Sequence, residues 1–315
     1  MNVQSQQNSE VSTRIKNAYE LFKNGAFRDA EQELEAALSA EFNNDEVISA
    51  LKCAGFWAER DAKYHDIEDE FERGEYLFKQ WRNFQKFLER DDGTYEQGIF
   101  ALKQWVFGRA LGDFLALIDG PAGSDPDVLY RIGSCYKGKG NYKQALEYFE
   151  ICNHQKADDP LILAALADCY AFINEVKAAK IFFREAFFLN PQQIDISSLE
   201  SLMIQRLIRR LQEMGYGPPE LAEWIPVYGV LFGVLNVKRE LRSLEYGKLK
   251  QSIFSLQSQL SDDGKRNYTT EPRLLNRYFW LIDHYIASGD TREKVDDALQ
   301  RIREINDSVY EYYIN

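Results

Sequence analysis

The sequence predicts an all-α protein in which antiparallel helical hairpins stack into a solenoid. Apolar residues recur at three- and four-residue steps along nearly the whole chain, as at Ile15, Ala18 and Phe22, which is the spacing of one helix face. Segments that alternate apolar and polar residues in the manner of strands are almost absent. The third observation is an internal repeat of 34 residues, a length typical of stacked helical units.

Four segments follow one another along the chain. Residues 1–9 are polar and predict a disordered tail, and residues 10–120 predict a first set of helical hairpins. Residues 121–191 hold the two clearest hairpins, and residues 192–315 predict further hairpins that have lost the repeat. We expect about fourteen helices of roughly 12–25 residues. Glycine marks helix ends at Asn24–Gly25, Gly140–Asn141 and Gly289–Asp290.

The repeat is clearest when residue 126 is aligned with residue 160. Small residues then align with small ones, and large residues with large ones. The matched pairs are Pro126/Pro160, Leu129/Leu163, Ile132/Leu166, Gly133/Ala167, Tyr136/Tyr170, Ala145/Ala179, Phe149/Phe183 and Cys152/Ala186. Two antiparallel helices approach closely only where one presents a small residue and a large side chain fills the space beside it. Each repeat is therefore predicted to be one helical hairpin.

These columns resemble the tetratricopeptide repeat family. In that family the first helix carries a small residue followed three residues later by Tyr, and the second helix carries Ala and then Phe. The resemblance is close over residues 126–191 and looser over residues 11–44, and elsewhere it covers only the hairpin architecture. It implies a right-handed superhelix whose concave wall is built from the first helices of successive repeats. It also implies that this wall binds a protein or peptide.

The resemblance places a candidate groove on the first helix of each clear repeat, opposite the packing residues. Its residues are Asp127, Tyr130, Arg131, Ser134 and Lys137, then Leu161, Ala164, Ala165, Asp168 and Phe172. Arg131 either binds a carboxylate through two N–H groups or is neutralised by Asp168 of the neighbouring helix; the sequence leaves both open. Tyr130, Ser134 and Ala165 stand where the chaperone-binding members carry a lysine–asparagine carboxylate clamp, so chaperone tails are not the expected ligand.

Composition limits the partners. The chain has 45% hydrophobic residues, enough for a folded core, and 38 Lys+Arg against 50 Asp+Glu give a net charge of −12. This sign disfavours nucleic acid, because affinity for phosphate comes from basic side chains. Residues 1–120 hold 23 acidic and 14 basic residues, so a partner attracted by charge to that segment should be basic.

The remaining motifs have simpler explanations than catalysis. Gly133–Gly140 lacks the hydroxyl residue of a phosphate-binding loop and is predicted to be helical. His65 and Asp69 have metal-ligand spacing but lie in an acidic, solvated stretch. No catalytic, cofactor or metal residue is predicted, and an enzyme is not expected. Two sets of residues are instead predicted to pack in helix contacts. They are Trp57, Trp81 and Trp105, which recur every 24 residues, and Cys135, Cys152 and Cys169.

The sequence favours a cytoplasmic protein without a membrane span. No secretory signal is visible, and the longest apolar stretch, Ile225–Leu235, is about half the length that a bilayer requires. Gly229 and Gly233 form a small-residue pair on an apolar helix over Val227–Val237, which predicts burial or self-association.

The leading function is a protein- or peptide-binding adaptor or scaffold. One alternative is a sensor that encloses a small peptide or an apolar ligand. The other is a structural subunit that forms homo-oligomers through its flanking hairpins.

Overall fold

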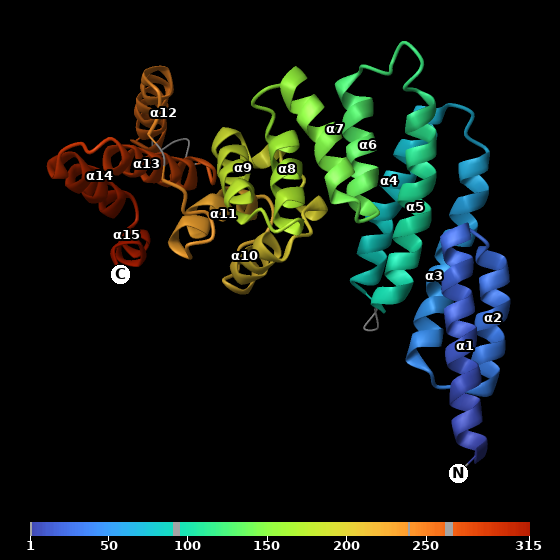
Figure 1. The fold of residues 1–315 in the computed structure, drawn as a ribbon. Coiled ribbons are helices and arrows are strands. Elements are labelled where there is room, and N and C mark those ends of the chain that lie inside the picture. The colour runs from blue at the N-terminus through green and yellow to red at the C-terminus, as the bar shows by residue number, and fades with distance from the viewer. Residues whose placement is uncertain (1, 91–94, 239, 262–266) are drawn as a thin grey trace. The chain divides into compact units, whose positions relative to one another are not determined.

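The computed structural model of this protein describes residues 2–90, 95–238, 240–261 and 267–315, with side chains from residue 9 onward. The described residues form fifteen α-helices and two short 3₁₀ helices and contain no strand (Figure 1). Consecutive helices pack in pairs, which confirms the predicted all-α repeat architecture. The chain divides into two compact units, Met1–Tyr148 (unit 1) and Phe149–Asn315 (unit 2). The boundary lies inside the first predicted repeat.

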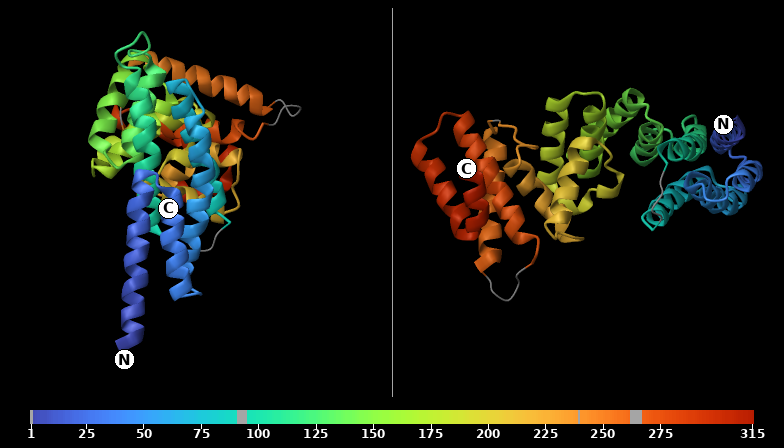
Figure 2. Two further views of the ribbon diagram at one scale, coloured as in Figure 1. Left: turned by 90° about the vertical axis from the view of Figure 1, so that its right-hand side faces the viewer. Right: turned by 90° about the horizontal axis from the view of Figure 1, so that it is seen from below.

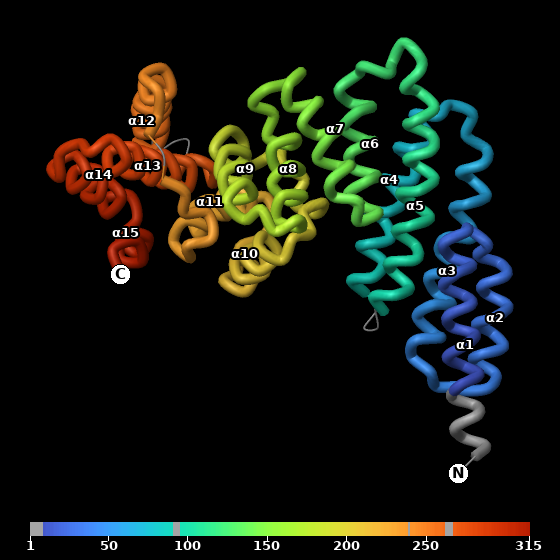
Figure 3. Tube along the Cα trace, in the orientation of Figure 1, coloured from blue at the N-terminus to red at the C-terminus, as the bar shows by residue number. Residues whose placement is uncertain are grey.

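Unit 1 is a stack of long helices. The helices are α1 (Asn2–Asn24), α2 (Phe27–Ala40), α3 (Asp45–His65), α4 (Glu70–Leu88), α5 (Glu96–Ala116), α6 (Pro126–Gly138) and the first half of α7 (Tyr142–Gln155). Figure 3 traces α1, α2 and α3 side by side. Helix α1 begins at Asn2, and the disordered tail over residues 1–9 stays a prediction. Helix α5 packs on α1 as well as on α4 and α6, a contact between distant segments that a nearest-neighbour solenoid lacks.

The core of unit 1 is made of aromatic rings. The three tryptophans spaced by 24 residues are all buried, which confirms that they lie in helix contacts. The Trp57 ring centroid is 6.3 Å from that of Trp81 and 5.5 Å from that of Trp105. Gly25 ends α1 with a φ of +75°, and a Cβ there would lie 2.2 Å from the Trp105 ring. The turn and the ring therefore both require glycine at this position.

Unit 2 begins with the second half of α7, followed by the second clear hairpin and then by less regular structure. Its helices are α8 (Pro160–Phe172), α9 (Val176–Leu189), the 3₁₀ helices η1 (Pro191–Gln193) and η2 (Ile196–Ser198), α10 (Leu202–Glu213), α11 (Glu220–Leu231), α12 (Ser243–Ser261), α13 (Thr270–Ala287), α14 (Arg292–Ile305) and α15 (Asp307–Ile314). Helix α11 packs on α9 and α13. Helix α12 packs on α13 and extends outward from the rest of the unit (Figure 2).

The 34-residue repeat is visible in the details of the two hairpins. Asp125 and Asp159 cap α6 and α8 by accepting hydrogen bonds from the main-chain N–H groups two residues on, at 2.8 and 2.9 Å. A ring pair recurs at the same offset, with centroid distances of 5.6 Å in the first hairpin and 5.4 Å in the second. These pairs are Tyr136–Tyr148 and Tyr170–Phe182. Ala145 and Ala179 are fully buried, as close helix packing requires.

Charged side chains hold the non-helical segments of unit 2. Lys180 donates hydrogen bonds to the Gly233 carbonyl and to Asn236 Oδ1, both at 3.0 Å. Arg184 is 4% exposed, pairs with Asp283 and donates to the Val237 carbonyl. Backbone carbonyls outside helices need such donors when they are buried.

One predicted helix is shorter than expected. The apolar stretch over Val227–Val237 leaves the helix after Leu231, and Gly233 adopts a φ of +70°. The chain then turns back, and Leu235 N donates to the Gly229 carbonyl at 2.7 Å. Gly229 and Gly233 therefore share no helix face. Residues 221–229 are buried within unit 2, as one of the two sequence interpretations expects, and self-association through the rest of this stretch stays a prediction.

Candidate functional site

The predicted groove stripe on α6 is largely used by contacts inside unit 1. Asp127 is exposed, and Tyr130, Arg131, Ser134 and Lys137 are half-buried. Arg131 forms an ion pair with Glu75 of α4 and lies 5.1 Å from the Phe78 ring centroid. The Ser134 hydroxyl donates to the Tyr130 carbonyl at 2.8 Å. Arg131 is thus neutralised by Glu75, not by Asp168, which was one of the two interpretations that the sequence left open.

The equivalent stripe on α8 is covered. Asp168 is fully buried, and its two carboxylate oxygens accept hydrogen bonds from Glu200 N and Ser201 N, both at 2.8 Å. Ala164 and Ala165 are buried as well, whereas Leu161 and Phe172 are half-buried. At the three buried positions the expectation of an open groove is wrong, because the chain that leads into α10 folds back onto α8. Ligand binding by the remaining stripe residues stays a prediction.

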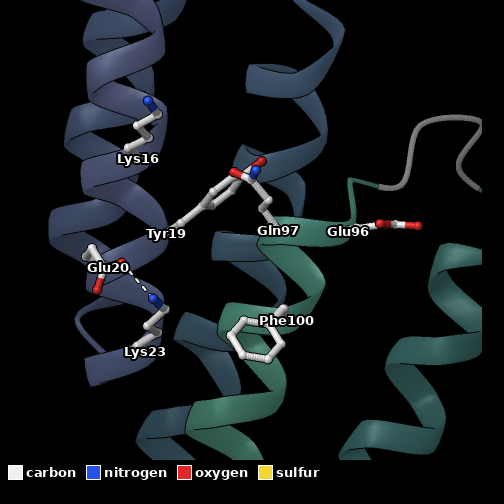
Figure 4. Close-up of a pocket in the computed structure, with 7 residues that line it drawn as sticks. All are labelled: Lys16, Tyr19, Glu20, Lys23, Glu96, Gln97 and Phe100. Carbon is white, nitrogen blue, oxygen red and sulfur yellow. Dashed lines mark hydrogen bonds and ion pairs between the residues drawn. The ribbon is translucent and has the colours of Figure 1, made fainter. Parts of the chain in front are cut away.

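An open hollow lies between α1 and α5. It has a volume of about 370 Å³ and is lined by residues of these two helices only: Lys16, Tyr19, Glu20, Lys23, Glu96, Gln97 and Phe100. Figure 4 shows Tyr19 reaching from α1 toward Gln97 and the Phe100 ring further along α5. Gly98 makes the approach feasible, since a Cβ at this position would lie 2.9 Å from the Tyr19 ring. Phe100 is 53% exposed, which leaves an apolar ring available to a ligand.

A second, more acidic hollow continues the first. Its volume is about 630 Å³, and it shares Lys16, Glu96 and Gln97 with its neighbour. Glu41 and Glu46 add two further carboxylates. The lining in full is Val11, Ser12, Ile15, Lys16, Glu41, Asn44, Glu46, Tyr95, Glu96 and Gln97. We call the two hollows together the α1–α5 groove: an aromatic ring lies at one end and three glutamates at the other.

Internal hydrogen bonds fix part of this groove. The Tyr19 hydroxyl donates to Glu46 Oε1 at 2.9 Å, and the Asn44 side chain donates to Glu41 Oε2 at 3.0 Å. Burial and the bond to Glu46 raise the pKa of Tyr19, so the hydroxyl keeps its proton. Lys23 pairs with Glu20 at 2.6 Å. Glu41 and Glu46 each keep a second carboxylate oxygen that can accept from a further donor.

A third hollow of about 460 Å³ lies near the start of α4. The buried Asp113 accepts from the Tyr64 hydroxyl at 2.8 Å and from Arg73 Nε at 2.9 Å. Burial and the bond to Asp113 raise the pKa of Tyr64 to about 12. Because the carboxylate already has both partners, this network is well explained as structure. Arg109 is the exposed cation on its rim.

The cysteines and the His65–Asp69 pair that the sequence singled out have structural roles. Cys53, Cys135, Cys152 and Cys169 are all buried, which confirms that the predicted trio occupies packing positions. His65 Nε2 lies 3.6 Å from Asp61, whereas Asp69 caps α4 by accepting from Glu72 N, so His65 and Asp69 have separate roles. The described residues contain no cluster of three His, Cys, Asp or Glu side chains suited to a metal ion. No helix among them has the length and apolarity that a bilayer span requires.

Sequence patterns did not reveal the α1–α5 groove. Its walls are about eighty residues apart in the chain, and the repeat motif is lost over α3 to α5. One signal was present: Phe100 is an aromatic residue outside the packing face of a helix whose other rings, Trp105, Phe107 and Phe114, are buried.

Comparison with known proteins supports the repeat assignment. Residues 126–152 match the tetratricopeptide repeat family, and this range covers α6 and most of α7. A search of curated proteins found no match. The matched segment carries the Gly133, Tyr136 and Ala145 columns on which the resemblance rests.

Proposed function

We propose that this chain, which contains a tetratricopeptide repeat over residues 126–152, is a protein-binding adaptor whose docking surface is the α1–α5 groove. Repeats of this family generally mediate protein interaction, which supports the general role. The observation that carries the location is the groove itself, in which the exposed Phe100 and the carboxylate of Glu41 line two hollows that share Lys16, Glu96 and Gln97. Ligand sites in proteins are concave and combine apolar area with a few polar groups in this way.

The partner segment that fits best is basic with one apolar anchor. Glu41, Glu46 and Glu96 outnumber the single Lys16 at the wide end of the groove. Residues 1–120 carry nine more acidic than basic residues, so a lysine- or arginine-bearing segment is also attracted from a distance. The apolar anchor would cover Phe100, since exposed rings that become buried contribute most to interface affinity.

Two synthetic peptides test this proposal. Each has twelve residues and a central Leu-Phe pair; one carries four lysines and the other carries glutamates at the same positions. Fluorescence anisotropy of labelled peptide measures the affinity of each for the wild type. We expect the lysine peptide to bind, the glutamate peptide to bind at least about tenfold more weakly, and salt to weaken the lysine peptide.

Single-residue variants test whether the lysine peptide binds in the α1–α5 groove. Phe100→Ala and Glu96→Lys should each weaken the lysine peptide by about tenfold. Matched controls are Phe254→Ala, which removes a 72% exposed ring from unit 2, and Glu59→Lys, which reverses an 82% exposed charge on α3. Both should leave the affinity unchanged within about twofold. If the groove variants bind as tightly as the controls, the docking surface lies elsewhere.

A further inference from the structure

Arg277 on α13 differs from other arginines of unit 2 in its described partners. Its side chain is half-buried, with the guanidinium carbon 3.8 Å from the Phe188 ring centroid and Nε donating to Ser252 Oγ at 3.2 Å. No carboxylate among the described residues forms an ion pair with it. Two other arginines of unit 2 differ in this respect, because Arg184 pairs with Asp283 and Arg273 with Glu223.

The surroundings of Arg277 disfavour its charged form. Burial and the neighbouring Arg273 lower its pKa to about 10, and Glu223, the acid that opposes this shift, is committed to Arg273. The groups of α9 and α12 in contact with Arg277 are Phe188 and Ser252, neither of which carries a charge. A desolvated cation without an anion costs stability, and departures of this kind are expected at functional positions.

The surroundings suit an oxyanion. A guanidinium has five N–H donors, and the bond to Ser252 uses one. The remaining four lie on the two terminal nitrogens, and the guanidinium carbon lies over the Phe188 ring. Ser252 accepts from Arg277, which leaves its own hydroxyl hydrogen to donate. Lys248 is one turn earlier on the same face of α12, and residues 251–261 contain no charged side chain that would repel an anion.

We propose that Arg277, with Ser252 and Lys248, binds a carboxylate from an acidic side chain of a partner protein. The planar edge of a ring-stacked guanidinium matches the two oxygens of a carboxylate. The proposal rests on the adaptor function for the source of the carboxylate. It assigns to unit 2 a contact opposite in sign to the one proposed for the α1–α5 groove.

The test follows the Arg277 side chain directly. Protein labelled with ¹⁵N-arginine shows Nε–H resonances, and the Arg277 signal is the one lost in Arg277→Met. The probe is an acetylated, amidated hexapeptide of alternating Asp and Glu, and the blank is its Asn and Gln analogue. We expect the acidic peptide to shift the Arg277 resonance saturably and the amide peptide to leave it in place. An unmoved Arg277 resonance at saturating acidic peptide overturns the proposal.

Variants separate a specific site from general charge attraction. Arg277→Met should weaken the acidic peptide at least about tenfold and leave the melting temperature unchanged or raised, because an unpaired cation is removed. Arg292→Met, which removes a 92% exposed charge from α14, is the control and should change the affinity less than about twofold. Equal weakening by both variants contradicts the proposal. If Arg277→Met does not fold, Arg277→Lys replaces it. Arg277→Lys keeps the positive charge but lacks the planar guanidinium, and it should also weaken binding of the acidic peptide.

Two further titrations identify the ligand and make the outcome for Arg277 independent of the outcome for the α1–α5 groove. Inorganic phosphate should bind more weakly than the acidic peptide; tighter phosphate binding overturns the carboxylate assignment. Phe100→Ala should leave the acidic-peptide titration unchanged, so failure of the groove proposal and failure of the Arg277 proposal are separately visible.

Discussion

Unit 1 buries aromatic rings against glycines, whereas unit 2 buries charged side chains against loop backbone. Trp57, Trp81 and Trp105 meet in the core of unit 1, and Gly25 and Gly74 leave space for rings. In unit 2, Asp168 and Arg184 are nearly or fully buried, and both bind main-chain groups. Unit 1 also buries Asp113, but its partners there are the side chains of Tyr64 and Arg73.

The difference follows from where each unit departs from helix. Helices satisfy their own backbone, so long helices joined by short turns need only apolar side chains in the core. Unit 2 has two described stretches outside its α-helices, residues 190–201 and residues 232–238 with 240–241. Their N–H and C=O groups receive partners from Asp168, Lys180, Arg184 and His284. In unit 2, buried Asp168 and Arg184 therefore mark places where the chain leaves the α-helix.

The largest effect that tests this comparison should come from the buried ion pair of unit 2. Asp283→Ala leaves the Arg184 guanidinium buried without an anion, and we expect a loss of about 3–5 kcal/mol in the free energy of unfolding. Urea denaturation measures it. The double variant Arg184→Met/Asp283→Leu removes both charges and should recover much of that loss. A double variant less stable than Asp283→Ala would mean that the pair is not held together by charge.

Overpacking at the equivalent alanines of the two repeats should have the next largest effect. The loss of stability should be similar in unit 1 and unit 2. Ala145→Leu in unit 1 and Ala179→Leu in unit 2 each place three extra carbons at a fully buried position, which costs about 1–3 kcal/mol. Thermal and urea unfolding of both variants measure this. If both melt like the wild type, the repeat register used here is wrong.

Two glycines of unit 1 give smaller effects of opposite sign. In Gly74→Ala the new Cβ would lie 2.3 Å from the Phe114 ring, so the cost of overpacking should exceed the gain of about 0.5–1 kcal/mol that alanine brings to a helix interior. Gly112→Ala on α5 meets nothing within 4 Å and should raise stability by that gain. Urea midpoints that move in the same direction for both variants would contradict the ring-against-glycine account.

The smallest effect concerns the thiols. Burial raises the pKa of Cys135 well above its ordinary value of 9.0, so little thiolate exists at pH 8 and thiol reagents should react only as the protein unfolds. Because the folded state holds this proton more tightly than the unfolded state, its contribution to stability is complete below pH 9.0 and declines as the pH rises further. Neither reductant nor EDTA should move the melting temperature at pH 8. A decrease with EDTA would indicate a metal site.

Local chemistry made the hairpins predictable, and long-range contacts made the surfaces unpredictable. Gly25, Gly140 and Gly289 end helices with positive φ as the sequence indicates, and Ala145 and Ala179 are buried in the predicted columns. The sequence did not indicate that Glu75 would pair with Arg131 across 56 residues. It also did not indicate that the chain after α9 would cover α8, because no helical period marks a segment of short 3₁₀ turns.

The Asp168 carboxylate also bears on how such a chain can grow. Helical repeat arrays lengthen when the gene segment for one hairpin is duplicated in place, which requires each hairpin to accept a copy of itself as its next neighbour. A copy inserted after Pro191 would displace Glu200 and Ser201 and so remove two main-chain hydrogen bonds from the fully buried Asp168 carboxylate. Asp168 therefore opposes duplication at this point. A lengthened array should be obtained only when the duplication is combined with a neutral residue at position 168.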